Sequence, residues 1–376
     1  MKIINGVVYK EDFCFHKEEV HVENGFFTEN TKDDIILDVN GCYVLPGFID
    51  IHLHGNSGYD FSKGEKEGLD HIADYLAVHG ITSFAIASMT QPYATLKTAY
   101  ENAAQFKNNA RKDTAQLLGI NMEGPFFSSE KKGAQSEKDL QLPDIEMVKS
   151  LNEAANGLIR IVCVAPELPK AMHFIQAVSQ FCTVSVAHTA ANYNVAKEAF
   201  EKGATQVTHL YNGMLPLLHR QPGVIGAAIE NSNVKAELIC DGIHVHESAV
   251  RAAFRMFGAE RIVLISDSLC VCGGENKQYE FGGHFISVKN GVAVLEDGIT
   301  FAGSTTDLFS CVKKAIAFGI QPEDAIRAAT WNPAEAVGAI KTVGSIKNGK
   351  NADFLICNKD FSLKATYIGG NLVKKW

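Results

Sequence analysis

Short apolar runs rich in β-branched residues recur along the chain from residue 47 onward, and longer amphipathic stretches separate them. Runs of this length are typical of buried strands, and the stretches between them have helical periodicity. Eight such runs can be counted, at residues 47–54, 81–88, 115–123, 159–167, 183–188, 205–209, 235–241 and 261–267. Parallel neighbours need crossover connections, which helices usually supply. The pattern therefore predicts an α/β fold, a parallel (β/α)8 barrel of the TIM type.

The stretch GLDHIADYLAVHG, residues 68–80, illustrates the helical pattern between the first two runs. Its apolar stripe at helical spacing consists of Leu69, Ile72, Ala73 and Leu76. Gly80 stands where a helix cap is expected. We therefore expect a crossover helix that buries this stripe and ends just before Gly80.

The two ends of the chain have a different pattern of short alternating segments separated by Asn-Gly pairs. Asn-Gly between apolar runs indicates a hairpin turn. We therefore expect residues 1–45 and 341–376 to form one small β-sandwich beside a barrel domain of residues 46–340. A hairpin-like insert at residues 278–298 follows the last barrel strand, on the face where barrel enzymes carry their sites, and is expected to wall the pocket.

Composition narrows the class of partner. The chain has 376 residues, of which 46% are hydrophobic and 21% charged, which is typical of a compact globular enzyme and not of a disordered chain. Its formal net charge is −8, whereas binding to a phosphate backbone relies on clustered Lys and Arg. We therefore expect a small-molecule substrate and no nucleic-acid partner.

The nine cysteines are odd in number, and several, such as Cys163, Cys182 and Cys240, lie inside apolar runs. A thiol in that setting behaves as a small hydrophobic side chain, which favours a reducing compartment. No apolar stretch approaches the roughly 20 residues of a membrane span, and the first residues lack the layout of a signal peptide. A cytoplasmic protein without membrane contact is expected.

The first apolar run carries two histidines. Side chains two apart on a strand share a face, so Phe48, Asp50, His52 and His54 are expected to point into the barrel together. Paired imidazoles at a strand end suit a divalent metal, whereas a structural pair would need hydrogen-bond partners to justify its burial. The His-x-His pair alone leaves both interpretations open.

Other predicted strands also end in a potential metal ligand. These residues are Glu123, His188, His209 and Asp267, after the third, fifth, sixth and eighth runs. The carboxyl ends of barrel strands converge, so all six groups are expected to meet at one face. Nitrogen and oxygen ligands of this mix fit Zn²⁺ or Fe²⁺. The sequence therefore predicts a metal-dependent site there.

Seven motifs now carry a resemblance: PGFIDIHLHG, NMEGPFF, VAHTAA, VTHLYNGM, CDGIHV, ISDS and FAGST. Over nearly its whole length the chain resembles the amidohydrolase superfamily and, within it, the N-acetylglucosamine-6-phosphate deacetylase family. PGFIDxHxH marks only the superfamily, whereas MEGPF, THLYNGM and DGIHV mark the deacetylase branch. The resemblance implies a hydrolase that converts N-acetyl-D-glucosamine 6-phosphate to D-glucosamine 6-phosphate and acetate in amino-sugar catabolism.

The same resemblance implies one or two divalent metals per subunit. One metal would be held by His52, His54, Glu123 and Asp267. The second would be held by Glu123, His188 and His209. Relatives that replace the His-x-His pair work with a single metal, so this sequence is of the type that can hold two.

The chemistry expected of such a site follows from the metal and one carboxylate. A bound metal lowers the pKa of its water towards ~7 and yields hydroxide next to the acetyl carbonyl. Asp267 is expected to take the proton of the water as general base and to deliver it to the departing amine as general acid.

For the phosphate, the resemblance points to His244, Arg220 and the backbone amides of Asn212 and Gly213. The guanidinium fork of arginine matches phosphate geometry, and the less favoured alternative is that Arg220 is a solvated loop residue. In the family this arginine can serve the phosphate of a neighbouring subunit. The resemblance therefore implies a homodimer.

Three further residues are expected to contact the sugar. Many relatives carry a histidine where this chain has Gln135, whose amide can donate a hydrogen bond but cannot carry a proton. Ala302 and Gly303 belong to the FAGST turn, which is expected to open a helix. Free amides there could meet a sugar hydroxyl or simply accept a cap.

Two other functions remain open. Fold resemblance alone does not exclude the galactosamine epimer or another amidohydrolase activity, such as hydrolysis of a cyclic amide or an adenine-type ring. A barrel that has lost its site and serves as an assembly module is the alternative from a different class, and the complete ligand set counts against it.

Overall fold

The computed structural model describes residues 1–274, 279–281, 284–289, 291–298 and 300–375. It confirms the predicted barrel, whose neighbouring strands are parallel in the order β15-β14-β13-β12-β11-β10-β9-β6. The strands are β6 (Phe48–Leu53), β9 (Ile81–Ser88), β10 (Gln116–Met122), β11 (Ile159–Val164), β12 (Thr183–Val186), β13 (Ala204–Val207), β14 (Lys235–Ile239) and β15 (Ile262–Ile265). The two end strands meet through the chain just after β15, because the backbone N–H of Asp267 donates to the carbonyl of His52 over 2.9 Å.

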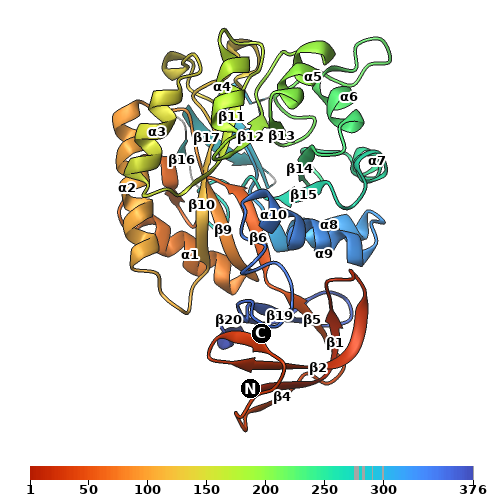
Figure 1. The fold of residues 1–376 in the computed structure, drawn as a ribbon. Helices are drawn as coiled ribbons and strands as arrows, with labels where there is room; N and C mark the ends of the chain where they lie inside the picture. Colours follow the sequence, from red (N-terminus) through yellow and green to blue (C-terminus); the bar gives the residue numbers. More distant parts are fainter. Residues whose placement is uncertain (275–278, 282–283, 290, 299, 376) are drawn as a thin grey trace.

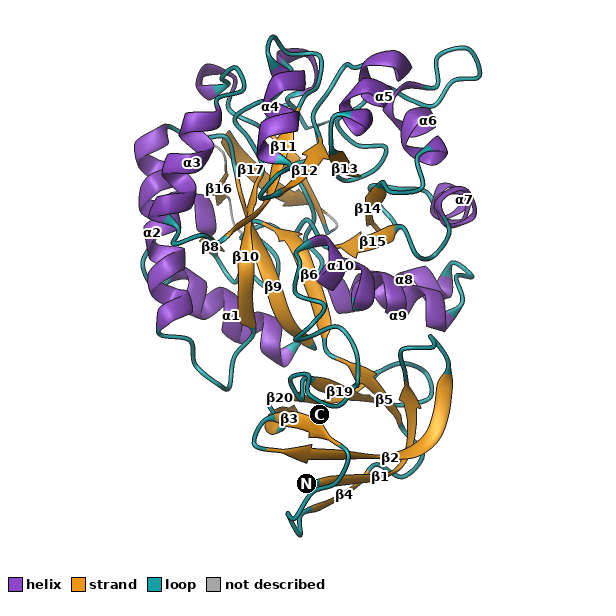
Figure 2. Ribbon diagram, viewed as in Figure 1, coloured by secondary structure: helices purple, strands orange, loops and turns teal. Residues whose placement is uncertain are grey.

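A helix follows each barrel strand and packs outside it (Figures 1 and 2). The helices are α1 (Gly68–Val78), α2 (Tyr93–Asn108), α3 (Ile145–Ala154), α4 (Ala171–Val178), α5 (Tyr193–Glu201), α6 (Gly223–Glu230), α7 (Glu247–Phe257), α8 (Leu308–Ala317), α9 (Pro322–Ala329) and α10 (Trp331–Ala336). In α1 the predicted apolar stripe is buried, and the following Gly80 has φ +83°. Across the described residues, no helix combines the length and the apolar character needed to cross a bilayer.

Strand β6 departs from the predicted alternation. The ring of Phe48 packs outward against Phe309 of α8, with ring centroids 5.4 Å apart, and not into the barrel with the histidines. Ile49 and Ile51 belong to a separate apolar cluster that also contains Val263. Phe48 belongs to the larger cluster that includes the buried faces of the helices. The pairing of β6 with β9 shifts register twice, and such irregularities break the period of two on which the prediction depended.

Both ends of the chain build one β-module below the barrel (Figure 1). Its eight strands form a single sheet of order β21-β20-β19-β5-β1-β2-β3, with β4 beside β1. They are β1 (Lys2–Tyr9), β2 (Phe15–Glu23), β3 (Phe26–Thr28), β4 (Ile36–Asp38), β5 (Tyr43–Pro46), β19 (Phe354–Cys357), β20 (Leu363–Ile368) and β21 (Asn371–Lys375). Phe27, Val44 and Phe354 belong to its own apolar core. On this basis we propose the division into one domain of residues 1–45 with 341–376 and another of residues 46–340.

The Asn-Gly pairs of this module differ in what they do. Asn24 and Gly25 form the two-residue turn between β2 and β3, both with positive φ, as predicted for a hairpin. Asn5 and Gly6 instead lie inside β1, where the pairing with β2 shifts register. Asn40 and Gly41 connect β4 to β5, which both pair in parallel with β1. They therefore lie beside the irregular part of β1 and do not form a hairpin turn. A bulge and a hairpin turn both need positive φ, so the dipeptide alone did not separate them.

The predicted insert after β15 is a three-stranded antiparallel sheet of β16 (Tyr279–Phe281), β17 (His284–Lys289) and β18 (Val292–Leu295). Gln278 and residues 282–283 and 290, which the predicted insert included, lie outside the described residues. The ring of Phe281 in this sheet lies 5.4 Å from that of His54, the residue that follows β6 at its carboxyl end. The helix predicted to open at the FAGST turn begins later, at Leu308 of α8.

Candidate active site

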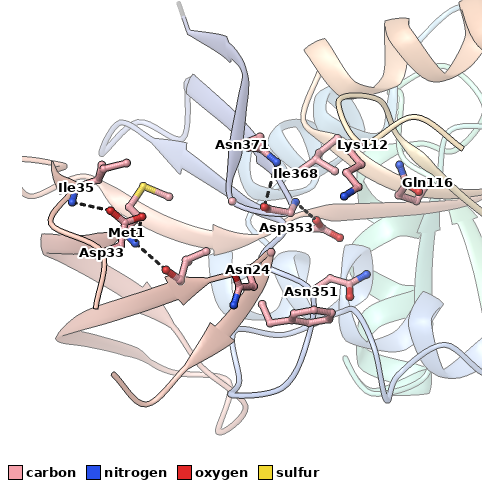
Figure 3. A pocket seen from close by; sticks show the side chains of 15 residues that line it. Met1, Asn24, Asp33, Ile35, Lys112, Gln116, Asn351, Asp353, Ile368 and Asn371 are labelled. Carbon is pink, nitrogen blue, oxygen red and sulfur yellow. Dashed lines mark hydrogen bonds and ion pairs between the residues drawn. The ribbon is translucent and has the colours of Figure 1, made fainter. Parts of the chain in front are cut away.

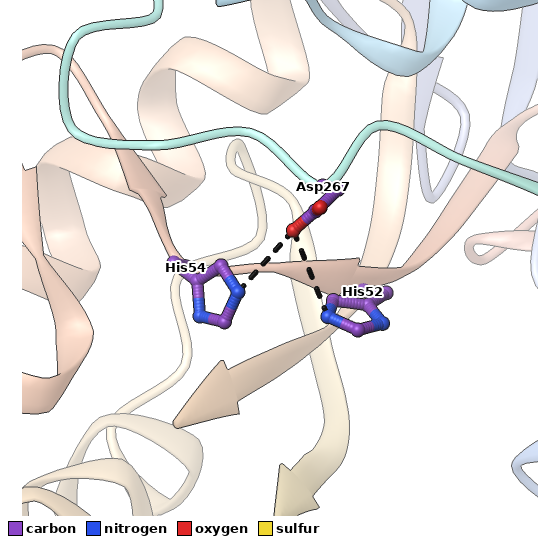
Figure 4. A group of neighbouring side chains, drawn as sticks. All are labelled: His52, His54 and Asp267. Carbon is purple, nitrogen blue, oxygen red and sulfur yellow. Dashed lines mark ion pairs between the residues drawn. The ribbon is translucent and has the colours of Figure 1, made fainter. Parts of the chain in front are cut away.

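The six predicted ligand residues come together at the carboxyl end of the barrel. They form two groups, His52 with His54 and Asp267, and Glu123 with His188 and His209, and all six side chains are buried. Figure 4 shows the first group, with the Asp267 carboxylate facing both imidazoles. The structure therefore brings together the six residues that the sequence predicts at one face.

Glu123 lies between the two groups. Its Oε1 is 3.5 Å from Nε2 of His52, and its Oε2 is 3.5 Å from Nε2 of His54. The same Oε1 is 3.3 Å from Nε2 of His188 and 3.2 Å from Nε2 of His209. One carboxylate thus faces all four imidazoles, as a bridging ligand would.

The spacing of the ligand atoms fits metal coordination. The Nε2 atoms of His188 and His209 are 3.2 Å apart, and Oδ1 of Asp267 is 3.3 Å from Nε2 of His54 and 3.7 Å from Nε2 of His52. Two ligand atoms that are each about 2.1 Å from a tetrahedral zinc lie about 3.4 Å apart. Each group can therefore accept a divalent cation with little rearrangement.

The four histidines are held in the tautomer that metal binding requires. Each Nδ1 faces an oxygen that can only accept a hydrogen bond, so each Nδ1 carries the proton and Nε2 is left towards the site. The acceptors are Oε2 of Glu237 for His52 (2.8 Å), the carbonyl of Ala87 for His54 (3.2 Å), the carbonyl of Lys131 for His188 (2.8 Å) and the carbonyl of Asn212 for His209 (3.0 Å). Nε2 of His52 is buried without a hydrogen bond among the described residues, which a metal would relieve.

The charges of the site favour a bound cation. Burial alone would raise the pKa of Glu123, but the imidazoles of His52, His188 and His209 hold it well below its ordinary value. Burial is likewise outweighed at Asp267, where the neighbouring imidazoles of His54 and His52 lower the pKa. Both carboxylates are therefore anions in a water-poor site, a state that needs positive charge nearby.

Three ligand residues sit on left-handed backbone. The φ angles are 43° at His188, 31° at His209 and 50° at Asp267. For residues other than glycine this conformation costs on the order of 1–3 kcal/mol each and concentrates at functional sites. The chain thus turns sharply as each strand ends, which aims these side chains into the site.

A pocket of about 290 Å³ opens above the ligand groups. The predicted substrate contacts that line it are Gln135, Asn212, Gly213, His244, Ala302 and Gly303. Phe281 of β16 also lines the pocket, so the insert walls the site as expected. Arg220 does not line it: this side chain is exposed on the loop after β13, and its guanidinium donates to Nε2 of His219 over 2.8 Å.

Gln135 is fixed with its amide nitrogen towards the ligand groups. Its Oε1 accepts the backbone N–H of Thr90 at 2.7 Å, and its Nε2 donates to Oε2 of Glu123 at 2.8 Å. The oxygen is therefore engaged on the protein side, and the donor faces the floor of the pocket. This orientation suits the predicted role of donor to a substrate oxygen.

Hydrogen bonds within the protein show which of the other predicted substrate contacts still have a free donor. The N–H of Asn212 already donates to the carbonyl of His209 at 2.9 Å, and the N–H of Ala302 donates to that of Ala293 at 3.2 Å. These two amides are therefore not free, contrary to the expectation from sequence. Nδ1 of His244 is bonded to Oδ2 of Asp241 at 2.7 Å, and His244 lines the pocket.

Sequence reasoning missed Glu237, which is fully buried on β14 and bonded to His52. The signal was a carboxylate in the middle of the apolar run KAELICD, at a position that alternation points into the barrel. Phe281 was also missed as an individual residue; its ring lies 5.4 Å from that of His54.

A larger hollow, of about 740 Å³, lies between the terminal sheet and the barrel (Figure 3). Two of its carboxyl groups have partners within the protein: Asp33 pairs with the N-terminus of Met1 at 3.0 Å, and Oδ1 of Asp353 accepts the N–H of Gly369 at 2.8 Å. None of the predicted site residues lines it. The smaller pocket over the ligand groups is therefore the candidate active site.

Gly213 gives a test of how tightly the site is packed. A Cβ there would lie 3.1 Å from Nδ1 of His188 and 3.2 Å from Cε1 of His209. We expect Gly213→Ala to lower the metal content of the Glu123–His188–His209 group, measured by elemental analysis after dialysis. Gly338→Ala is the matched control, since Gly338 has a similar φ, +71° against +62°, and open space around it. Both variants should lose about 1–2 kcal/mol of stability from backbone strain, and equal metal contents would contradict the prediction.

Comparison with known proteins agrees with this geometry. The Amidohydrolase family model matches residues 43–373. The N-acetylglucosamine-6-phosphate deacetylase of Bacillus subtilis is 36% identical over 352 residues, which cover 92% of this chain and 89% of that protein. The Bos taurus protein of the same name is 33% identical over 382 residues, covering 98% of this chain and 92% of that protein.

Among solved structures, a mutant form of N-acetyl-D-glucosamine-6-phosphate deacetylase from Mycobacterium smegmatis, in complex with N-acetyl-D-glucosamine-6-phosphate, superposes with a TM-score of 0.92. It is 27% identical, and the match covers 99% of each chain. The likeness therefore extends through the barrel and the terminal sheet alike. The chain belongs to the amidohydrolase family and, within it, to the N-acetylglucosamine-6-phosphate deacetylase family.

Proposed function

We propose that this protein hydrolyses the acetamido group of N-acetyl-D-glucosamine 6-phosphate and releases D-glucosamine 6-phosphate and acetate. The observation that carries the proposal is the pair of buried ligand groups at the floor of a pocket that His244 and Gly213 also line. The named activity of the relatives supports the same reaction. The chain retains every ligand residue, so a non-catalytic barrel is disfavoured.

Two divalent metals, zinc or iron, fit the two groups, with Glu123 as the shared ligand. His52, His54 and Asp267 would hold one, and His188 and His209 the other. A metal bound here would polarise the acetyl carbonyl and acidify a water molecule beside it. Nitrogen and oxygen ligands do not discriminate between zinc and iron, so the availability of each metal ion would decide which one is bound.

The residues of the chain supply the proton transfers and the positioning. Asp267 takes a proton from the attacking water as the new C–O bond forms at the acetyl carbon. It then passes that proton to the amine nitrogen as the C–N bond breaks, because an amide anion is a very poor leaving group. Gln135, with its amide nitrogen towards Glu123, donates a hydrogen bond to a substrate oxygen but does not transfer protons.

The phosphate is met by His244, by the amide of Gly213 and by Arg220 from a second copy of the chain. Arg220 is exposed and lies outside its own pocket, and the neighbouring Leu217 and Leu218 are 41% and 48% exposed, as an unpaired subunit interface would be. A homodimer in which each arginine serves the other subunit accounts for all three observations. The nine unpaired cysteines support a cytoplasmic location.

The competing activities are deacetylation of the galactosamine epimer and hydrolysis of other amidohydrolase substrates. The negative charge of the phosphate distinguishes the proposed substrate from uncharged substrates of the second kind. We expect Arg220→Ala to lower kcat/KM for the phosphorylated sugar by about 10- to 100-fold, the loss of a hydrogen bond to a charged group. Activity on N-acetylglucosamine without the phosphate should not change. The exposed Arg111→Ala, which loses a surface ion pair with Asp113, is the control.

Acetate release at several concentrations of both sugars measures these ratios. Equal losses on the two sugars would contradict a phosphate contact. Size measurement of Arg220→Ala in solution shows whether the variant keeps the assembly state of the wild type.

A further inference from the structure

The Glu237 side chain lies deep in the barrel, below the pocket, where a lone carboxylate would be unstable. Its exposed fraction is 0%, and donors surround both oxygens. Oε2 accepts from Nδ1 of His52 at 2.8 Å and from the backbone N–H of His209 at 3.3 Å, and Oε1 accepts from Nε2 of Gln206 at 2.6 Å. Glu237 therefore touches one residue of each ligand group.

The histidines of the site differ in the acceptor at Nδ1. The other three donate to backbone carbonyls, whereas His52 donates to a carboxylate. A carboxylate behind a ligating imidazole fixes its tautomer and ring orientation and strengthens it as a ligand. Nε2 of His52, on the opposite side of the ring, is buried and makes no hydrogen bond with the described residues.

We propose that Glu237 is the positioning residue that allows the His52–His54–Asp267 group to retain its own divalent metal, and that it ties this group to the backbone of His209. The inference rests on the metal sites of the proposed function and extends them, because it assigns the retention of one particular metal to a residue that does not touch it. Glu237 acts through His52 and is not a catalytic residue.

The test is a metal titration of the purified full-length protein with Zn²⁺ and with Co²⁺, whose visible spectrum reports coordination. Glu237→Ala should lower the affinity for one of the two metals by about 10- to 100-fold and leave the other unchanged. Glu237→Gln keeps an oxygen that can accept from Nδ1 but loses the charge, so a smaller loss, confined to the same metal, is expected. Asp353→Asn removes another buried carboxylate, in the terminal sheet, and should retain wild-type affinity for both.

Unchanged affinity for both metals in Glu237→Gln and Glu237→Ala would overturn the inference, as would equal weakening of both. If Glu237→Ala does not fold, the glutamine variant decides by the same criterion. A wild-type protein that binds a single metal at saturation would also overturn it, yet would leave the deacetylation proposal standing. A wild-type protein that binds two metals but releases no acetate would contradict the deacetylation proposal and leave the inference about Glu237 standing.

Discussion

Asp267→Asn is expected to lower kcat for acetate release by about 10²- to 10⁴-fold, the range that a positioned acid–base group contributes. The asparagine amide has the shape of the carboxylate, and its oxygen can still face His52 and His54, which lie 3.7 Å and 3.3 Å from Oδ1. It can neither accept the proton of water nor return one to the amine. The protein should therefore stay folded and bind substrate while the chemical step fails.

Acetate release at saturating substrate, with circular dichroism and elemental analysis of the same sample, separates these outcomes. The exposed Asp360→Asn is the control for loss of a negative charge. An unchanged kcat in Asp267→Asn would eliminate its acid–base role. A low rate accompanied by loss of metal would instead assign Asp267 to metal binding alone.

Removing the metals with a chelator is expected to lower activity by at least about 10³-fold, because metal polarisation of the carbonyl contributes several kcal/mol and each 1.36 kcal/mol is a factor of ten. The apoprotein should also be less stable, because its buried carboxylates Glu123 and Asp267 lose their strongest counter-charge. A metal present at about 1,000 times its dissociation constant stabilises the fold by about 4 kcal/mol.

Thermal unfolding and acetate release, before chelation and after return of Zn²⁺ or Fe²⁺, measure both effects. Recovery with one equivalent would mean that a single group suffices, and recovery with two that both are needed. Full activity in a metal-free sample would contradict the metal-dependent account altogether.

The barrel was predictable because its strands are buried on both faces and read as apolar runs between amphipathic stretches. All eight predicted runs contain strand residues, although Glu123, His188, His209 and Asp267 lie just beyond the strand ends and not within them. The terminal module was harder, because a bulge at Asn5 and a hairpin at Asn24 begin with the same dipeptide and differ only in what pairs with them. Strand pairing is a long-range property that a local motif does not contain.

The convergence of the ligand residues followed from barrel topology, but their precise aim did not. His188, His209 and Asp267 adopt left-handed backbone, which is uncommon for residues other than glycine, so tertiary contacts must hold it in place. Glu237 was missed for a related reason, since its partners His52 and Gln206 come from other strands. Motifs reveal which residue types a site contains, whereas the hydrogen-bond acceptors behind the histidines depend on the closed barrel.

Arg220 does not line the pocket of its own chain, so the structure of one chain does not place it beside the substrate. Its loop is exposed, and the phosphate contact that we propose for it would be made with a second copy of the chain. Gln135, by contrast, is held by Thr90 and Glu123 within one chain. Its amide can donate a hydrogen bond but cannot carry a proton.

Acetate release by the purified, metal-analysed protein from N-acetylglucosamine 6-phosphate, N-acetylgalactosamine 6-phosphate and unphosphorylated N-acetylglucosamine tests the proposed deacetylation. We expect the highest kcat/KM for N-acetylglucosamine 6-phosphate, with acetate and glucosamine 6-phosphate formed in equal amounts. A higher kcat/KM for either other sugar, or no acetate from any of them with metal bound, would contradict it.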